Sequence, residues 1–120
     1  MILFKTLIDK SAGKGLGLFA AEFIPKDSLV YENSIQKIKK YDTEALSAFS
    51  SFYMDTYTWV VGDNVHHCID DTMYINHADD PTVDGATGKA LRDINPGEEI
   101  TENYSTFDPS YDTYKHLLKP

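Results

Sequence analysis

The chain has 120 residues, of which 42% are hydrophobic, and a formal net charge of −8 at pH 7. A chain of this length supports one compact domain with a single core. It has no stretch close to the roughly 20 apolar residues of a membrane span and no signal-peptide pattern near its start. Its one cysteine, Cys68, excludes an internal disulfide and a multi-cysteine zinc cluster. We therefore expect a single domain over residues 1–120 inside the cell, in the cytoplasm by default, or in a host nucleus if the chain is viral.

The acidic charge is concentrated in the second half of the chain. Residues 1–60 contain seven acidic and seven basic side chains, whereas residues 61–120 contain twelve acidic and four basic ones. Such a surface repels the phosphate backbone of nucleic acids and attracts lysine-rich peptides. We expect a basic protein segment as partner, with no direct binding of nucleic acid and no membrane contact.

The first half of the sequence predicts short strands followed by one helix. β-prone residues at 2–8 and 16–20 flank a glycine-containing turn, and further short strands are expected at 29–32 and 35–38. Between residues 42 and 54, apolar side chains recur three and four positions apart behind residues that can cap a helix. This spacing predicts one amphipathic helix.

The second half predicts two strand pairs and a helical tail. The strands are expected at residues 57–61 and 65–69 around Gly62-Asp63-Asn64, and at residues 88–93 and 98–104 around Asn95-Pro96-Gly97. Asp108-Pro109 is typical of a helix start, and the cations Lys115, His116 and Lys119 are favoured near a helix end. Periodicity alone therefore indicates a mostly β domain with one or two short helices.

Three short motifs occur in a fixed order along this framework. They are Gly15-Leu16-Gly17, Tyr74-Ile75-Asn76-His77, and the segment from Gly97 to Tyr104. Together they resemble the SET-domain family of protein-lysine methyltransferases, and the resemblance covers nearly the whole chain. The chain departs from the family pattern in two places. Met73-Tyr74 stands where Arg-Phe is common, and the residues after Asn76-His77 are Ala78-Asp79-Asp80-Pro81-Thr82 where the family has Ser-Cys-Asp-Pro-Asn.

The resemblance implies a specific fold. SET domains consist of several small sheets in a β-clip arrangement with a C-terminal pseudoknot, a threaded connection that propensities alone would not propose. Here the threaded piece would be residues 100–107, which would bring Tyr104 beside Asn76 and His77. Residues 109–118 would form a helical tail that closes the site, without the cysteine-rich zinc segments that flank many relatives.

The resemblance also implies a reaction and a set of site residues. The implied reaction moves a methyl group from S-adenosylmethionine to the side-chain amine of lysine in a protein, such as a histone tail. The implied cofactor-binding residues are Lys14, Gly15, Leu16, Gly17, Asn76 and His77, with Lys14 and Leu16 contributing mainly backbone contacts. Tyr104 would be the catalytic residue, orienting the amine and stabilising the sulfonium. Tyr31, Tyr74, Phe107 and Tyr111 would line the substrate channel.

Other interpretations of the same residues remain open at this point. A Gly-x-Gly segment alone is more often a turn, and Ala78 and Thr82 would suit a SET-like module that binds a peptide or the cofactor without turnover. A purely structural acidic domain and a homodimer that completes the channel wall are further alternatives. A metal site among His66, His67, Cys68 and the nearby aspartates is disfavoured, because adjacent strand residues point to opposite faces and no zinc-ligand spacing is present.

Overall fold

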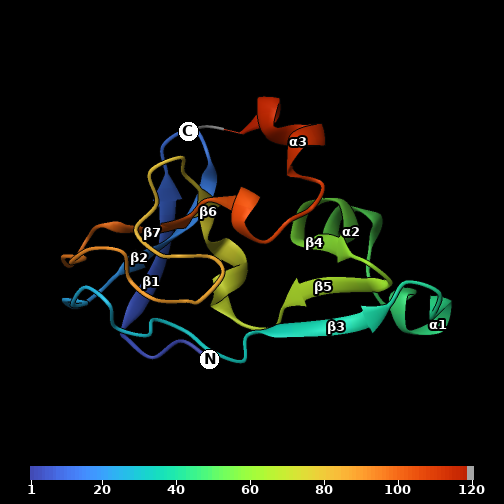
Figure 1. The fold of residues 1–120 in the computed structure, drawn as a ribbon, viewed down its shortest axis with the longest axis horizontal. Coiled ribbons are helices and arrows are strands. Elements are labelled where there is room, and N and C mark those ends of the chain that lie inside the picture. The colour runs from blue at the N-terminus through green and yellow to red at the C-terminus, as the bar shows by residue number, and fades with distance from the viewer. Residues whose placement is uncertain (119–120) are drawn as a thin grey trace.

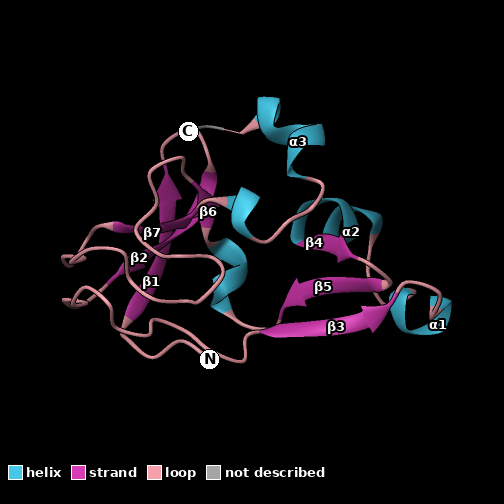
Figure 2. Cartoon of the chain, in the orientation of Figure 1, coloured by secondary structure: helices cyan, strands magenta, loops and turns pink. Residues whose placement is uncertain are grey.

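The computed structural model describes residues 1–118, and its first sheet contains strands from both ends of the chain. The four strands are β1 (Thr6–Ser11), β2 (Gly15–Ala20), β7 (Glu99–Glu102) and β6 (Asn76–His77), in the order β1-β2-β7-β6. β1, β2 and β7 pair antiparallel, whereas β6 and β7 pair parallel. Figures 1 and 2 show this sheet on one side of the molecule. The pairing places β7, which follows Gly97, directly beside the strand of Asn76 and His77. β2, which begins at Gly15, is the next strand beyond β7.

A second sheet of three strands lies on the other side of the molecule (Figure 2). Its strands are β3 (Ile35–Lys39), β5 (Asn64–Cys68) and β4 (Thr58–Val61), in the order β3-β5-β4. β4 and β5 form the predicted hairpin, because Gly62 adopts the left-handed conformation (φ 59°) that the tight turn needs. The helices α1 (Thr43–Leu46) and α2 (Ser51–Tyr57) connect β3 to β4.

Short helices fill the space between and above the two sheets. The 3₁₀-helix η1 (Asp71–Tyr74) leads into β6, and η2 (Tyr104–Thr106) follows β7 almost directly. The tail contains α3 (Tyr111–Tyr114) and η3 (Lys115–Leu117). In Figure 1 the red α3 lies over the space between the two sheets.

The hydrophobic core packs around the first sheet. Leu18 on β2 lies opposite Ile100 on β7, and both are almost fully buried, as are Ile24 and Ile94, which form a bridge between two loops. Burial of each such side chain stabilises the fold by about 1.5–3 kcal/mol. The core therefore fixes β2 against β7, the two strands from which site residues extend.

The predicted threading of residues 100–107 agrees with the contacts on both sides of that segment. On one side, β7 pairs with β6. On the other, Thr101 and Thr82 hydrogen-bond each other's side chains through their backbone N–H groups at 2.9 and 3.2 Å. A Cβ on Gly85 would lie 2.6 Å from Thr106 Oγ1, so the loop at Gly85 also lies directly against this segment. The mostly β fold with several small sheets is thus confirmed.

Five predicted elements differ in extent. Residues 29–32 and 88–93 form isolated bridges instead of strands, because each stretch pairs with its neighbour at one position, as in Leu29 with Lys89. The first strand begins at Thr6 rather than at residue 2. The helix predicted for residues 42–54 is split, since the Ser50 side chain accepts from Tyr53 N and starts a second helix, α2. The last strand ends at Glu102, where Asn103 caps η2.

The tail is helical as predicted, although its regular part is short. Asp108 does not cap α3 directly, and Pro109 precedes the helix, which begins at Tyr111. Lys115 and His116 lie in the last turn of η3, whereas Lys119 lies outside the described residues. None of the helices in residues 1–118 has the length and apolar character needed to cross a membrane.

Candidate active site

The first candidate site is a cavity of about 280 Å³ beside the glycine turn. It is lined by Gly13, Lys14, Asn76, His77, Tyr104, Leu117 and Leu118. These residues come from the β1–β2 turn, β6, the start of η2 and the tail. The cavity thus brings together residues of the second and third motifs with Gly13 and Lys14, which immediately precede the first motif, whereas Gly15, Leu16 and Gly17 do not line it.

Asn76 is held by two hydrogen bonds from its side-chain amide. Its Nδ2 donates to the carbonyl oxygen of Leu16 and to Oε2 of Glu99, both at 2.9 Å. Both N–H donors are therefore used within the protein, and the orientation of the amide is fixed. The side-chain oxygen has no hydrogen-bond partner among residues 1–118 and can therefore accept from a ligand.

Glycine at position 17 is required by the close approach of Asn76 and Glu99. A Cβ there would lie 2.7 Å from Glu99 Oε2 and 3.1 Å from Asn76 Nδ2. Glu99 is itself fixed on its other oxygen, Oε1, by Ser11 Oγ at 2.7 Å. Gly15 has a different requirement, because its φ of 75° lies in the left-handed region. Glycine is thus required at positions 15 and 17 for two different reasons, a left-handed backbone at the first and a close contact at the second.

His77 links the cavity to Tyr104 through its buried ring. Its Nδ1 accepts from the backbone N–H of Tyr104 at 3.1 Å, and its Nε2 pairs with Asp79 Oδ1 at 2.8 Å. This pattern assigns the proton to Nε2, because Nδ1 must accept. The backbone carbonyl of His77 accepts from Lys14 Nζ at 2.9 Å. The Lys14 side chain therefore bonds within the protein, to the Asn-His motif, whereas mainly backbone contacts were expected of this residue.

The hydroxyl of Tyr104 donates to the carbonyl oxygen of Ile75 at 2.6 Å. Burial raises the pKa of this phenol above its ordinary value, and the negative charges of Glu102, Cys68 and Glu99 raise it further. The hydroxyl is thus protonated at neutral pH and its hydrogen is already used. The lone pairs of its oxygen remain available, which suits positioning and electrostatic stabilisation better than proton abstraction.

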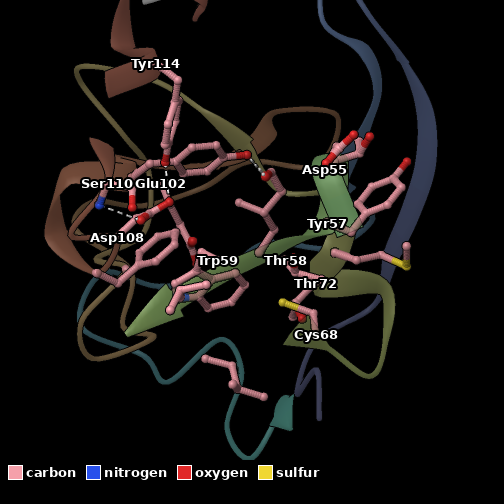
Figure 3. A pocket seen from close by; sticks show the side chains of 18 of the residues that line it. Asp55, Tyr57, Thr58, Trp59, Cys68, Thr72, Glu102, Asp108, Ser110 and Tyr114 are labelled. Carbon is pink, nitrogen blue, oxygen red and sulfur yellow. Dashed lines mark hydrogen bonds between the residues drawn. The ribbon is translucent and has the colours of Figure 1, made fainter. Parts of the chain in front are cut away.

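A second, larger cavity of about 630 Å³ also has Tyr104 in its wall. Its lining comes from β4, α2, η1, η2 and the tail, and in Figure 3 Tyr57, Thr58 and Thr72 lie on one side of it and Asp108, Ser110 and Tyr114 on the other. Aromatic residues line it, including Tyr31, Trp59 and Phe107, and so do the carboxylates of Asp55, Glu102 and Asp108. Within residues 1–118 its lining contains no lysine or arginine. The cavity is thus apolar, aromatic and acidic, a combination that suits a cationic side chain.

Glu102 is a buried carboxyl in this cavity wall. The hydroxyl of Tyr31 donates to its Oε1. Burial raises the pKa of Glu102 to about 7, the bond from Tyr31 lowers it, and the charge of Asp84 raises it. The sequence places Glu102 among the acidic residues expected near the path of a basic peptide, but its burial does not follow from the sequence, because a glutamate in a strand of alternating polarity is normally exposed to solvent.

The four residues predicted to line the channel divide into two pairs. Tyr31 and Phe107 line the larger cavity. Tyr74 does not, because its ring packs against the hydrophobic core and near Tyr57. Tyr111 lines neither cavity, since its ring packs against the ring of His77 with 5.6 Å between centroids. For Tyr74 and Tyr111 the structure therefore gives packing positions in place of channel positions.

The tail contacts both cavities. Leu117 and Leu118 line both, and Tyr114 lines the larger one. The hydroxyl of Tyr114 donates to Oδ2 of the buried Asp108, whose Oδ1 accepts from Ser110 N at 2.9 Å. Asp108 thus anchors the tail across the site, as Figure 3 shows for Asp108, Ser110 and Tyr114.

Three further lining residues were not identified from the sequence. Trp59 extends from β4, and its ring lies 5.2 Å from that of Phe107. Asp55 belongs to α2 and Cys68 to β5. The one signal for Trp59 was its place on a short hairpin strand, and nothing in the sequence relates that hairpin to the tail.

Of the departures from the SET pattern, Met73 lines the larger cavity, whereas residues 78–82 line neither cavity. Thr82 is buried, and its hydroxyl donates to the Glu99 carbonyl and accepts from Thr101 N. Neither Thr82 nor Ala78 lines a cavity. Thr82 thus fulfils a structural role within the fold that does not disturb the site.

The histidines of the hairpin are used in packing. His67 hydrogen-bonds Tyr53 and Gln36, and His66 packs against Trp59. No group of three potential metal ligands occurs within residues 1–118.

Comparison with known proteins agrees with this architecture. The family model of the SET domain matches residues 15–105, more than half of the chain. Among solved structures, the chain is similar to a crystal structure described as a putative histone methyltransferase of Plasmodium falciparum. The two share 20% sequence identity with a TM-score of 0.62, over 86% of this chain and 95% of that one. A search of curated proteins gave no match. The chain belongs to the SET-domain family, as its three motifs predicted.

Proposed function

We propose that this protein is an S-adenosylmethionine-dependent protein-lysine methyltransferase. The observation that carries the proposal is that Tyr104 is part of the wall of two different cavities. The smaller is bordered by the glycine turn and Asn76, whereas the larger is aromatic and acidic. A transferase with two substrates needs such a shared wall, since the reacting groups must meet there.

The residues of the smaller cavity fit the methionine end of the cofactor. Asn76 offers an acceptor oxygen for the amino group, and Gly13 and Lys14 line the cavity immediately before Gly15 and Gly17, the glycines predicted to bind the cofactor. Ligand pockets usually measure roughly 300–1,000 Å³, so a cavity of about 280 Å³ suits part of this molecule. When bound, the cofactor supplies the methyl group from its sulfonium.

The larger cavity supports lysine as the acceptor. A lysine side chain has an apolar stem and a cationic end, and the lining offers aromatic faces and carboxylates for the two parts. With a reference pKa of about 10.4, deprotonation of the ammonium at pH 7 costs on the order of 4 to 5 kcal/mol. Burial in the cavity lowers the pKa of the amine and reduces this cost.

Tyr104 would orient the amine. Its hydroxyl hydrogen is held by Ile75 and its backbone N–H by His77, so the oxygen is fixed at the boundary of the two cavities. Orientation of reactants by fixed groups is worth several kcal/mol in favourable cases, on the order of 7 to 11. His77 and Ile75 thus act as positioning residues for Tyr104.

A lysine-rich protein segment is the proposed substrate class. The net charge of −8, with the excess acid in the second half of the chain, favours a basic partner. Asp79 and Asp80 carry exposed carboxylates; Asp79 bonds to the ring of His77, which lines the smaller cavity, and Asp80 lies 3.7 Å from Arg92. Histone tails have this character, and so do other lysine-rich proteins.

The experiment is methylation of a protein mixture with methyl-labelled S-adenosylmethionine. Core histones and total cell protein are incubated with the wild-type chain and with Tyr104→Phe, and labelled bands are analysed by mass spectrometry. We expect label on lysine that is lost in the variant. If the wild-type chain binds the cofactor but labels no protein under any condition, the enzyme proposal fails and a binding module replaces it.

A further inference from the structure

Glu102 is a carboxyl enclosed in the larger cavity with one oxygen still open. Its side chain is buried, and its single side-chain hydrogen bond is the one that Tyr31 donates to Oε1. Within residues 1–118, every fully buried side-chain oxygen or nitrogen has a hydrogen-bond partner. Because Oε2 of Glu102 has none, this oxygen is not fully buried. It contacts the volume of the cavity, where a ligand can reach it.

This carboxyl has no cation of its own. The groups that face it are Tyr31, Cys68, Asp84 and Tyr104, each of which is neutral or negative. No lysine, arginine or histidine belongs to the cavity lining in residues 1–118. Buried carboxylates are normally paired, because an unpaired buried charge is costly. A cationic group that enters the cavity from outside would supply the partner that the lining lacks.

We propose that Glu102 accepts a proton from the ammonium group of the substrate lysine before methyl transfer, an inference that rests on the proposed function. Cavity geometry supports this assignment, since Glu102 and Tyr104 are both in the wall of the same cavity and lie two residues apart at the end of β7. Tyr104 would orient the nitrogen, and Glu102 would receive its proton.

The step is a single proton transfer. One Nζ–H bond of the lysine ammonium breaks, and an O–H bond forms at Oε2 of Glu102. The electron pair of the broken bond stays on Nζ as the lone pair needed for attack. The charges of the two groups cancel, so an ammonium and a carboxylate become an amine and a carboxylic acid. The proton then leaves to solvent when the cavity opens after the product departs.

The environment of Glu102 suits this task. Reference pKa values are about 10.4 for lysine and about 4.3 for glutamate, a difference of roughly six units. Burial raises the pKa of Glu102 to about 7, which reduces the difference to roughly three. A base whose pKa lies near the working pH is the most effective one, because it is partly ionised yet still basic. Asp84 and Tyr31 act on this pKa in opposite directions.

The test is the pH dependence of kcat/KM between pH 5.5 and 9.5, measured with core histones as the probe substrate. Wild type should lose activity below a pH near 7, as Glu102 becomes protonated. Glu102→Gln should reduce kcat/KM at pH 7 by about 100-fold or more. The loss should shrink towards pH 9.5, where the amine ionises without help. Glu44→Gln, an exposed change on α1, is the matched control and should behave as wild type.

A second variant separates proton transfer from a merely structural role. Tyr31→Phe removes the hydrogen bond that lowers the pKa of Glu102, so the acidic limb of the profile should move to higher pH. The carboxyl itself can be followed by ¹³C NMR in protein labelled at glutamate, with the Glu102 signal assigned by its loss in Glu102→Gln. Its midpoint should coincide with the kinetic limb and move with it in Tyr31→Phe.

The outcomes distinguish this inference from the proposed function. If wild type methylates lysine but the profile of a folded Glu102→Gln keeps the same acidic limb, Glu102 is not the proton acceptor and the enzyme assignment stands. A mismatch between the NMR midpoint and the kinetic limb would have the same meaning. If wild type labels no protein at any pH, both ideas fail together.

Discussion

The backbone N–H of Tyr104 donates to Nδ1 of His77 at 3.1 Å. This bond joins the Asn-His motif to the motif that ends at Tyr104. Because Nε2 of the same ring pairs with Asp79, the imidazole is fixed at both nitrogens. The position of the tyrosine is therefore set by its backbone as well as by its hydroxyl. A variant can thus remove the hydroxyl and leave the location of the ring largely intact.

Tyr104→Phe should lower turnover by about 100-fold or more, because the oxygen that orients the amine is lost. Affinity for S-adenosylmethionine should change less than about threefold, since the ring and the backbone bond remain. Methyl-transfer rates and calorimetry measure the two quantities. Tyr111→Phe is the control, because Tyr111 packs on His77 but lines neither cavity. Unimpaired turnover in Tyr104→Phe would remove this residue from the catalytic role.

Asn76→Ala should weaken cofactor binding by about 10-fold or more, which corresponds to about 1.4 kcal/mol. The change removes the acceptor oxygen and also leaves the Leu16 carbonyl and Glu99 without their donor. Calorimetry with S-adenosylmethionine gives the dissociation constant, and Asn95→Ala in the exposed turn is a matched comparison. Equal affinities of Asn76→Ala and wild type would contradict the assignment.

Gly17→Ala should destabilise the fold by about 1–3 kcal/mol, because its Cβ would overlap Glu99 Oε2 and displace the side chain. Urea denaturation measures the loss. In a Glu99→Ala background the overlapping atom is absent, so Gly17→Ala should destabilise that variant much less than it destabilises wild type. Additive losses in this cycle would show that the close approach is not what demands glycine.

Stability should depend on pH through Glu102. Its folded pKa of about 7 lies above its ordinary value, so the folded state keeps a proton that the unfolded chain has lost. The free energy of unfolding contributed by this group is therefore fully present below about pH 4.5 and falls by up to about 3 kcal/mol as pH rises through 7. His66 and His67 have lowered pKa values and act in the opposite direction. The difference between wild type and Glu102→Gln, measured by denaturation at several pH values, isolates the glutamate; a pH-independent difference would contradict the assigned pKa.

Tyr114→Phe should loosen the tail. The hydroxyl that donates to buried Asp108 is lost, which costs about 1 kcal/mol. Amide hydrogen exchange in residues 111–117 should accelerate about fivefold, and KM for a protein substrate should rise. Tyr41→Phe, at an exposed position, serves as control. Identical exchange in the two variants would mean that other contacts hold the tail.

The sequence predicted the strands with strong local signals and the family from its ordered motifs. β2, the β4–β5 hairpin and the short helical tail were all found, because glycine turns, β-branched runs and helix caps act locally. The strands predicted for residues 29–32 and 88–93 were wrong, because the pairing of these residues depends on which segment lies opposite them. A loop that pairs at one position has the same sequence pattern as a strand.

The candidate site shows the same division. Asn76, His77 and Tyr104 could be located from motifs, and they lie together. Glu102 was expected near the substrate path, but neither its burial nor the place of Trp59 in the cavity wall could be predicted, since both follow from the packing of β7 and β4 against the tail. Tyr74 and Tyr111 were assigned to the channel as aromatic residues near the motifs, but composition does not determine which way a ring points.

The parallel pairing of β6 with β7 has a consequence for folding. Residues 76–77 and 101–102 can pair only after the intervening chain has closed on itself, and loop closure of this kind slows folding. Both cavities require that pairing, because Tyr104 follows it directly. A chain still emerging from the ribosome would form neither cavity before residues 101–104 are free to pair with and pack against β6. The glycine turn and the Asn-His strand would thus wait for this later segment before they border a cavity.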